Sequence, residues 1–159
     1  MSPKAPLTQS VENLLNPAYC ALLIEAATRE HAKETGRSMP FALAFLILPL
    51  CLPSSFRDAL PKSKSTVFHA WLNANGHLRA ELPAFTTAYA PYTRKALRYG
   101  LQCGALKLEE DALRTRPKTP TLNASTDTAE ALAKATFLGR WLGTAGTTQS
   151  VFMMGGIRP

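Results

Sequence analysis

Hydrophobic and polar positions change their spacing between residues 91 and 117, and the change predicts a helix followed by a β-hairpin. The first half has the 3.6-residue period of a helix packed on a core. Its apolar stripe consists of Tyr92, Ala96, Leu97, Tyr99, Leu101 and Cys103. Gly104 stands where a helix ends in the left-handed conformation. Residues 105–108 and 112–116 then alternate like strands, on either side of an acidic turn. This order predicts the second half of a winged helix, a module that presents a basic helix and a wing to DNA or serves as a protein-docking platform.

Capping residues and prolines delimit further helices on both sides of this unit. Asn16 is a good N-cap, Pro17 is a good first helical residue and Gly36 is a good stop for the first helix. Gly76 is expected to end another helix, and Pro83 is tolerable only near a helix start. The predicted helices are residues 17–35, 40–52, 56–60, 63–75, 78–90, 92–103 and 127–143. The chain then ends in a loop and a short apolar strand or tail at 151–159.

A continuous apolar run at residues 41–52 predicts a helix that is buried on every side. It is too short to span a bilayer, which needs about 20 residues. The run is therefore either the central element of the domain or part of a contact with a partner. The fold class that follows is mainly α with a small β-hairpin, as a winged-helix-like single domain at 16–159 behind an N-terminal arm at 1–15. The expected core includes Leu22, Leu46, Phe68, Trp71, Leu97, Leu101 and Trp141.

Composition supports a globular protein with an anionic partner. The chain has 159 residues, of which 46% are hydrophobic, and a formal net charge of +7. A basic surface attracts phosphate backbones or acidic protein faces, although a surplus of solubilising Lys and Arg gives the same count. The three cysteines stand among apolar neighbours and are expected to be reduced core residues of a cytoplasmic protein. Their positions are Cys20, Cys51 and Cys103.

Catalytic and metal-binding patterns are weak in this sequence. The three histidines lack a Cys or His at ligand spacing, and the acidic cluster at 109–111 is most simply a solvated turn. The Gly155-Gly156 pair is not followed by the Lys and Ser or Thr of a phosphate-binding loop. The sequence therefore predicts a protein without catalytic residues, metal or cofactor.

Basic residues of the helix and wing are the candidate binding site. They are Arg94, Lys95, Arg98, Lys107, Arg114 and Arg116. These side chains could bind phosphates or pair with the carboxylates of an acidic partner. The alternative is that they form an ordinary solvated face of the helix. The helix offers few side chains for base edges beyond Gln102, which favours backbone contact as the form of any DNA binding.

Several strings together resemble the small middle components of bacterial three-component ABC-ATPase conflict systems, the class that includes the small subunit of Lamassu-type antiphage defence. The strings are NPAYCALLIEAA, LAFLILPLCLPSSFRDALPKSKSTVFHAWL, PYTRKALRYGLQCGALKLEEDALR and FLGRWLGTAGTTQSVFMMGGIRP. The resemblance covers nearly the whole chain from Asn16. None of these strings is a catalytic motif.

The resemblance implies a cytoplasmic, non-catalytic subunit that joins an SMC-like ABC ATPase to an effector, commonly a nuclease. We expect any contact with DNA to be made through the complex, and the short apolar run predicts no membrane contact. The alternative is a stand-alone winged-helix DNA-binding regulator, which draws on the same basic helix and wing. A regulator of that kind normally needs a dimer, and the sequence offers no long heptad helix to supply one.

Overall fold

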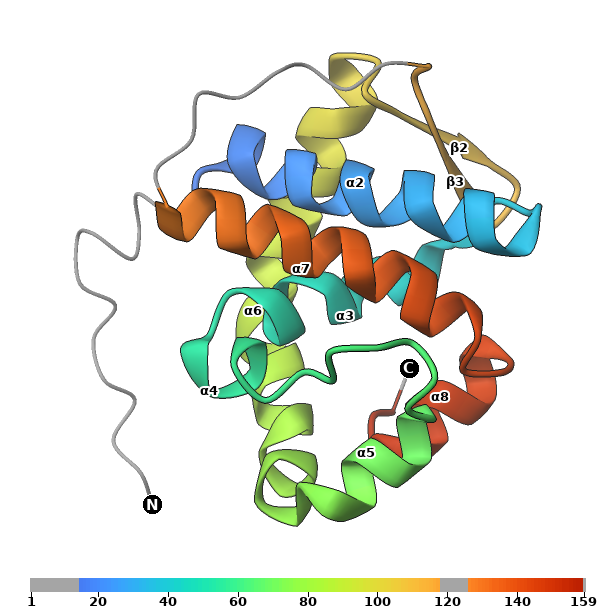
Figure 1. Ribbon diagram of the computed structural model, residues 1–159. Coiled ribbons are helices and arrows are strands. Elements are labelled where there is room, and N and C mark those ends of the chain that lie inside the picture. The colour runs from blue at the N-terminus through green and yellow to red at the C-terminus, as the bar shows by residue number, and fades with distance from the viewer. Residues whose placement is uncertain (1–14, 118–125, 159) are drawn as a thin grey trace.

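The described residues of this computed structural model, 15–117 and 126–158, contain seven α-helices, a short 3-10 helix and a three-stranded sheet (Figure 1). In chain order the elements are α2 (Pro17–Thr35), β1 (Met39–Pro40), η1 (Phe41–Leu43), α3 (Ala44–Cys51), α4 (Ser54–Arg57), α5 (Phe68–Ala74), α6 (Gly76–Gln102), β2 (Leu106–Glu109), β3 (Ala112–Thr115), α7 (Thr126–Gly143) and α8 (Thr148–Met154). The mainly α, single-domain prediction with a small β part is confirmed.

The first predicted helix is confirmed with its caps. The Asn16 side chain accepts hydrogen bonds from the amides of Ala18 and Tyr19, which satisfies amides that lack a partner within α2. Gly36 ends α2 with a φ of 71°, a left-handed conformation that glycine adopts without strain. Both signals are local, so the sequence alone placed the two ends of this helix.

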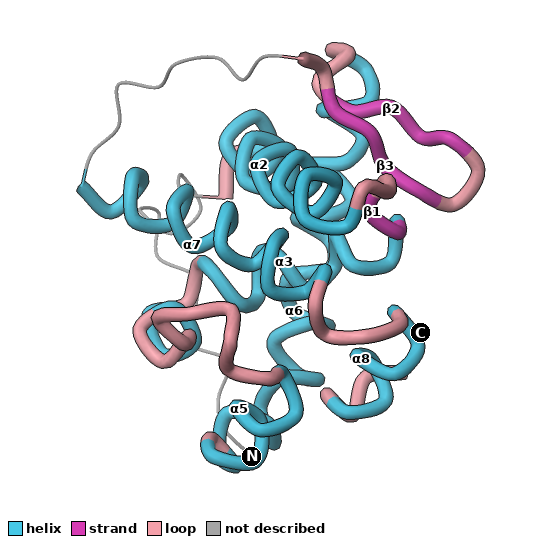
Figure 2. Tube along the Cα trace, turned by 45° about the vertical axis from the view of Figure 1, so that its right-hand side comes forward, coloured by secondary structure: helices cyan, strands magenta, loops and turns pink. Residues whose placement is uncertain are grey.

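Helices α2 and α7 pack side by side although they come from opposite ends of the chain (Figures 1 and 2). Gly139 permits this close approach, because a Cβ atom there would stand 2.1 Å from the carbonyl oxygen of Ala27. The last helix predicted from the sequence, residues 127–143, is confirmed as α7. The expected cap at Ser125 lies outside the described residues.

Helix α3 forms the centre of the core, as its uniform apolar sequence predicts. Every residue of α3 except Phe45 is buried, and α3 packs against α2, α6 and α7. Most of the run at residues 41–52 is thus buried in the core and is not available as a contact surface for a partner. Among the described residues, no helix combines the length and apolarity that crossing a membrane requires.

The hairpin at β2 and β3 is confirmed, and β1 extends it into a sheet with the order β1-β3-β2. The pairing is antiparallel, with Met39 opposite Leu113 and Leu108 opposite Leu113 from the other side. Gly104 has the expected left-handed φ of 80°, and Glu110 turns the hairpin with a φ of 58°. Strand β1 was not predicted, because two residues carry no periodic signal and pair only in the folded domain.

Two helices predicted at 78–90 and 92–103 are a single helix, α6, so the predicted break between them is wrong. Pro83 and Pro91 both lie inside α6. Helix α5 ends at Ala74, close to the predicted stop at Gly76, and Gly76 is already the first residue of α6. Each proline removes one amide donor from the helix, a loss that normally kinks or breaks it. The buried side of α6 packs against α2 and α3 along much of its length, and this tertiary packing keeps the helix continuous.

Other predictions fail where packing rotates or extends an element. Residues 63–67 precede α5 instead of belonging to it, and Val67 is 52% exposed. The C-terminal segment expected as a strand or tail forms α8, whose N-cap is the Thr147 hydroxyl. Leu101 is 37% exposed and Cys103 is exposed as well, so neither is a core residue, and Leu22 is only half-buried. The remaining core predictions are confirmed for Leu46, Phe68, Trp71, Leu97 and Trp141.

An aromatic cluster joins α5 to α7 and holds the connection before α5. Trp141 packs against Phe68, Trp71 and Phe137, with ring centroids 5.2, 5.4 and 5.6 Å away. The Trp71 indole donates a hydrogen bond to the Ala59 carbonyl, and the Trp141 indole donates one to the Thr66 carbonyl, both at 2.7 Å. The two tryptophans therefore fill the core and also fix an irregular segment.

Candidate functional site

Arg94, Lys95 and Arg98, here called the basic trio, are exposed on the C-terminal half of α6. The Lys95 ammonium lies 5.8 Å from the centroid of the Tyr92 ring, a cation–π arrangement. Among the described residues, none of the trio forms an ion pair, and Glu81 is the single acidic residue of α6. The sequence-based prediction that these side chains face outward agrees with the structure.

The trio faces outward because the opposite side of α6 packs on the core. A helix turns about 100° per residue, so residues three, four and seven apart share one side. The buried side of α6 comprises Leu78, Leu82, Thr86, Thr93, Ala96, Leu97 and Gly100. This side is rotated from the stripe predicted through Tyr92, Tyr99 and Cys103, of which Tyr99 is 43% exposed. Gly100 contributes to the shift, because a Cβ atom there would be 2.7 Å from the Leu106 Cδ1 atom of β2.

A shallow apolar groove lies on the same outer side of α6, before the trio. It has a volume of about 470 Å³ and is lined by Pro83, Ala84, Thr87, Ala88 and Pro91. We call these five residues the apolar groove. Pro91 has no amide hydrogen to donate to the Thr87 carbonyl, and Pro83 has none for the Arg79 carbonyl. The groove therefore combines small apolar side chains with two backbone carbonyls that lack their usual amide donors within the helix.

The hairpin residues of the candidate site differ in how far their charges are balanced. Lys107 is exposed, and its hairpin neighbour Arg114 donates from Nη1 to both Glu109 carboxylate oxygens, at 3.0 and 3.2 Å. Arg116, at the end of the hairpin, reaches back to α2 and bonds the Glu25 carboxylate. The hairpin tip also carries Glu110 and Asp111, which reduce its net positive charge.

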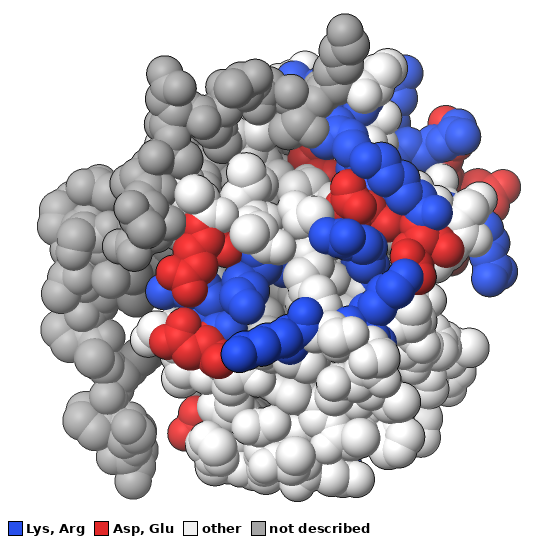
Figure 3. All heavy atoms as spheres, in the orientation of Figure 1, with Lys and Arg blue, Asp and Glu red and all other residues white. Residues whose placement is uncertain are grey.

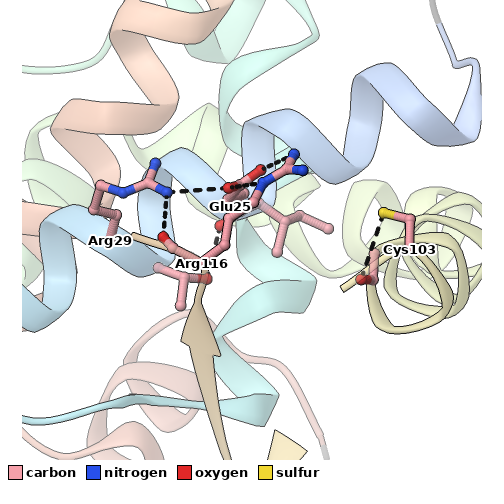
Figure 4. Close-up of polar contacts among 7 residues, drawn as sticks. Glu25, Arg29, Cys103 and Arg116 are labelled. Carbon is pink, nitrogen blue, oxygen red and sulfur yellow. Dashed lines mark hydrogen bonds and ion pairs between the residues drawn. The ribbon is translucent and has the colours of Figure 1, made fainter. Parts of the chain in front are cut away.

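Glu25 binds two arginines from different elements (Figure 4). Its carboxylate accepts hydrogen bonds from Arg116 at 2.9 and 3.1 Å and from Arg29 at 3.0 Å, and Arg29 also donates to the Arg116 carbonyl at 2.8 Å. Hydrogen bonding to the buried Glu25 carboxylate raises the pKa of the Arg116 guanidinium. This triad ties the end of β3 to α2, and no local sequence signal could have paired residues so far apart in the chain.

A small cleft opens beside the triad, between α2 and the end of α6. Its volume is about 270 Å³, and its lining includes Ala18, Ala21, Leu22, Tyr99 and Cys103 together with Glu25 and Arg116. The Cys103 thiol contacts the Gly100 carbonyl at 3.7 Å (Figure 4). Because the ionic groups of this cleft already bond each other, it does not offer a free charge to a ligand.

Charge is distributed unevenly over the rest of the surface (Figure 3). Lys, Arg, Asp and Glu mix over α2, α7 and the hairpin. On α2, Glu30 pairs with Lys33 at 3.2 Å, and Glu34 pairs at 2.6 Å with Lys64 of the segment before α5. Helices α5 and α8 contain no charged residue, and Met153 of α8 is 72% exposed. Among the described residues, the positive charges without an ion-pair partner are thus unevenly distributed. The basic trio of α6 brings three of them together on one helix.

The described residues hold no group of three or more His, Cys, Asp or Glu side chains that could bind a metal ion. His31 is buried on the α2 side of the α2–α7 contact, and burial lowers its pKa. Burial raises the pKa of the Cys20 thiol to about 12 and raises that of Cys51 further. His31, Cys20 and Cys51 lie in the core instead of converging on a cleft.

Comparison with known proteins identifies the chain by family. Residues 5–159 match the family of ABC-three component (ABC-3C) system Middle Component 3. Because the match covers almost all of the sequence, the chain belongs to this family. No curated protein and no solved structure matches the chain significantly.

Proposed function

We propose that this middle component is a non-catalytic bridging subunit of an antiphage defence complex, which links an SMC-like ABC ATPase to an effector, most simply a nuclease. The observation that carries the proposal is the family match over residues 5–159, because a middle component of a three-component ABC system is defined by the proteins it accompanies. The sequence strings that resemble Lamassu-type small subunits support placing the complex in that defence class. The proposed location is the cytoplasm, where such an ATPase and its DNA would meet.

The surface of the described residues supports a binding role. Its densest unpaired charge lies beside an apolar groove on one long helix, whereas the Cys20 and Cys51 thiols, whose pKa values burial raises, lie in the core. An adaptor needs exposed recognition surfaces on a stable scaffold and does not need convergent catalytic groups. DNA, in this proposal, is reached through the assembled complex.

Winged-helix likeness is part of the proposal and draws support from the chain order. A first helix is followed by a short strand, then by further helices, and then by a hairpin whose second strand pairs with the first strand. In this interpretation α6 takes the place of the basic helix and β2–β3 forms the wing. Subunits of this kind can use the same helix and wing to dock proteins instead of DNA.

Co-purification tests the bridging function. The tagged full-length chain is co-expressed with the ABC ATPase and the third component encoded beside it, and the complex is analysed by size-exclusion chromatography with mass determination. We expect both proteins to co-elute with this chain, and the effector to lose its contact with the ATPase when this chain is omitted. A monodisperse free monomer that binds neither protein would refute the proposal.

A stand-alone winged-helix DNA-binding regulator is the second candidate, because the basic trio lies in the half of α6 that leads into the hairpin, and Lys107 of the hairpin is exposed as well. A regulator should bind its own promoter far more tightly than unrelated DNA of the same length. Equal affinity for both duplexes, lost as salt is raised, would instead fit auxiliary backbone contact within a complex.

A further inference from the structure

The outer side of α6 is one continuous stripe with two chemically distinct halves. Ala84, Ala88, Pro91, Lys95 and Arg98 recur at spacings of three or four residues, so they line one side of the helix. The apolar groove forms the first half and the basic trio forms the second half. This side lies opposite the side that packs on α2 and α3. Most of its residues are exposed, and Pro83 and Ala88 are half-buried.

The apolar half is suited to close contact with another helix. Its side chains are small or ring-shaped, and helix axes approach more closely where the side chains at the contact are small. Alanines at 84 and 88 stand one turn apart, flanked by two prolines that leave backbone carbonyls without their usual intrahelical donors. A partner that covers this half therefore gains apolar burial and encounters no competing charge.

The basic half determines the charge of the partner. Three neighbouring cations without an ion-pair partner among the described residues favour carboxylates or phosphates at that end. A DNA backbone carries a phosphate at every nucleotide and would leave the cation-free groove without a counterpart. A protein segment that is apolar in one half and acidic in the other matches both halves of the stripe.

We propose that the outer side of α6 is the docking surface for an acidic amphipathic helix of a partner protein. Small apolar side chains of that helix pack into the apolar groove, and its carboxylates pair with Arg94, Lys95 and Arg98. This inference rests on the proposed function, since it takes the partner to be one of the other components of the complex.

Two groups of variants test the two halves separately in the full-length chain. The triple variant R94A/K95A/R98A removes the positive charge, and the double variant A84E/A88E places two carboxylates in the groove. The control triple variant R37A/K62A/R158A removes the same charge from exposed residues that form no ion pair among the described residues. The control double variant A129E/A133E adds two carboxylates at the same spacing on the exposed side of α7.

Each variant is co-expressed with the ATPase and the third component, and the affinity for each purified protein is measured by titration. We expect both α6 variants to lose at least about tenfold in affinity for the same one of the two proteins, because each disrupts half of one interface. Both control variants should bind like the wild type, and circular dichroism should show all five proteins to be folded.

Three other outcomes would overturn the inference. If both α6 variants bind the two proteins as the wild type does, the stripe is not a docking surface, although the bridging function stands. If the triple variant keeps both proteins and loses affinity for a random 30-base-pair duplex, the basic trio contacts DNA. If the wild type itself binds neither protein, the proposed function fails, and the docking inference fails with it.

Discussion

Removal of the Trp141 indole should destabilise the domain through two separable losses. The side chain is 1% exposed and packs against three aromatic rings, and its indole nitrogen donates to the Thr66 carbonyl at 2.7 Å. Truncation of a buried large aromatic side chain to alanine typically costs about 3–5 kcal/mol. Since a domain has only about 5–15 kcal/mol of stability, W141A should lose a large part of it, and a domain at the low end of this range would be mostly unfolded.

The variant W141F separates the hydrogen bond from most of the ring packing. It keeps an aromatic ring in the cluster but leaves the Thr66 carbonyl without its donor, a loss worth about 1–3 kcal/mol. We expect W141F to lie between the wild type and W141A in free energy of unfolding. Urea unfolding followed by far-ultraviolet circular dichroism measures this quantity without relying on tryptophan fluorescence.

Val67 supplies a matched control, because it adjoins the same segment but is 52% exposed. The V67A variant should change the free energy of unfolding by less than about 0.5 kcal/mol. If W141A and W71A both unfold at the wild-type urea concentration, the reasoning is wrong, and the two tryptophans would then serve an interface instead of the core.

Four further results should follow from contacts described above. The G139A variant should lose about 3 kcal/mol of free energy of unfolding, because the new Cβ atom would meet the Ala27 backbone. The G76A variant should be neutral or stabilising, since nothing lies within 4 Å of its new Cβ atom, and equal melting temperatures of the two variants would contradict this reasoning. The E25Q variant should lose about 2–3 kcal/mol by leaving two arginines without their carboxylate, and E30Q, which breaks exposed pairs, less than about 1 kcal/mol; thermal unfolding compares them. Burial lowers the pKa of His31 in the folded state, so the folded protein binds fewer protons there, and stability should fall as the pH drops below the unfolded pKa of about 6.5, with a smaller fall in H31Q. Removal of the basic trio should reduce the slope of log affinity against log salt by about three for DNA bound by the assembled complex if all three touch phosphates, and an unchanged slope with lost protein binding marks a docking face.

Local signals predicted the parts of this fold whose ends are set by neighbouring residues. The Asn16 cap, the Gly36 stop and the left-handed Gly104 each act within one turn, and each is found as expected. The two prolines of α6 misled the prediction because their local cost is met by packing of the opposite side of the helix, which is invisible in sequence spacing.

In the candidate site, too, local signals were predictable and contacts between distant residues were not. The exposure of the basic trio follows from helical periodicity, which separates charged from apolar positions. The role of Arg116 could not be predicted, since its partner Glu25 lies 91 residues away and the two meet only when β3 reaches α2. The apolar groove was also missed, because the predicted break placed Pro91 outside the helix that carries the other four groove residues.

The pairing of α2 with α7 sets a long delay between synthesis and completion of the core. Helix α2 ends at Thr35, and the helix that covers the side around Ala27 begins at Thr126 and ends at Gly143. At about 5–20 residues per second, a ribosome needs on the order of ten seconds to make the intervening chain and α7. During that interval the nascent chain exposes the apolar residues of α2 and α3, which attracts chaperones and favours aggregation. Premature termination before α7 should therefore yield a product that is degraded or insoluble instead of a smaller folded domain.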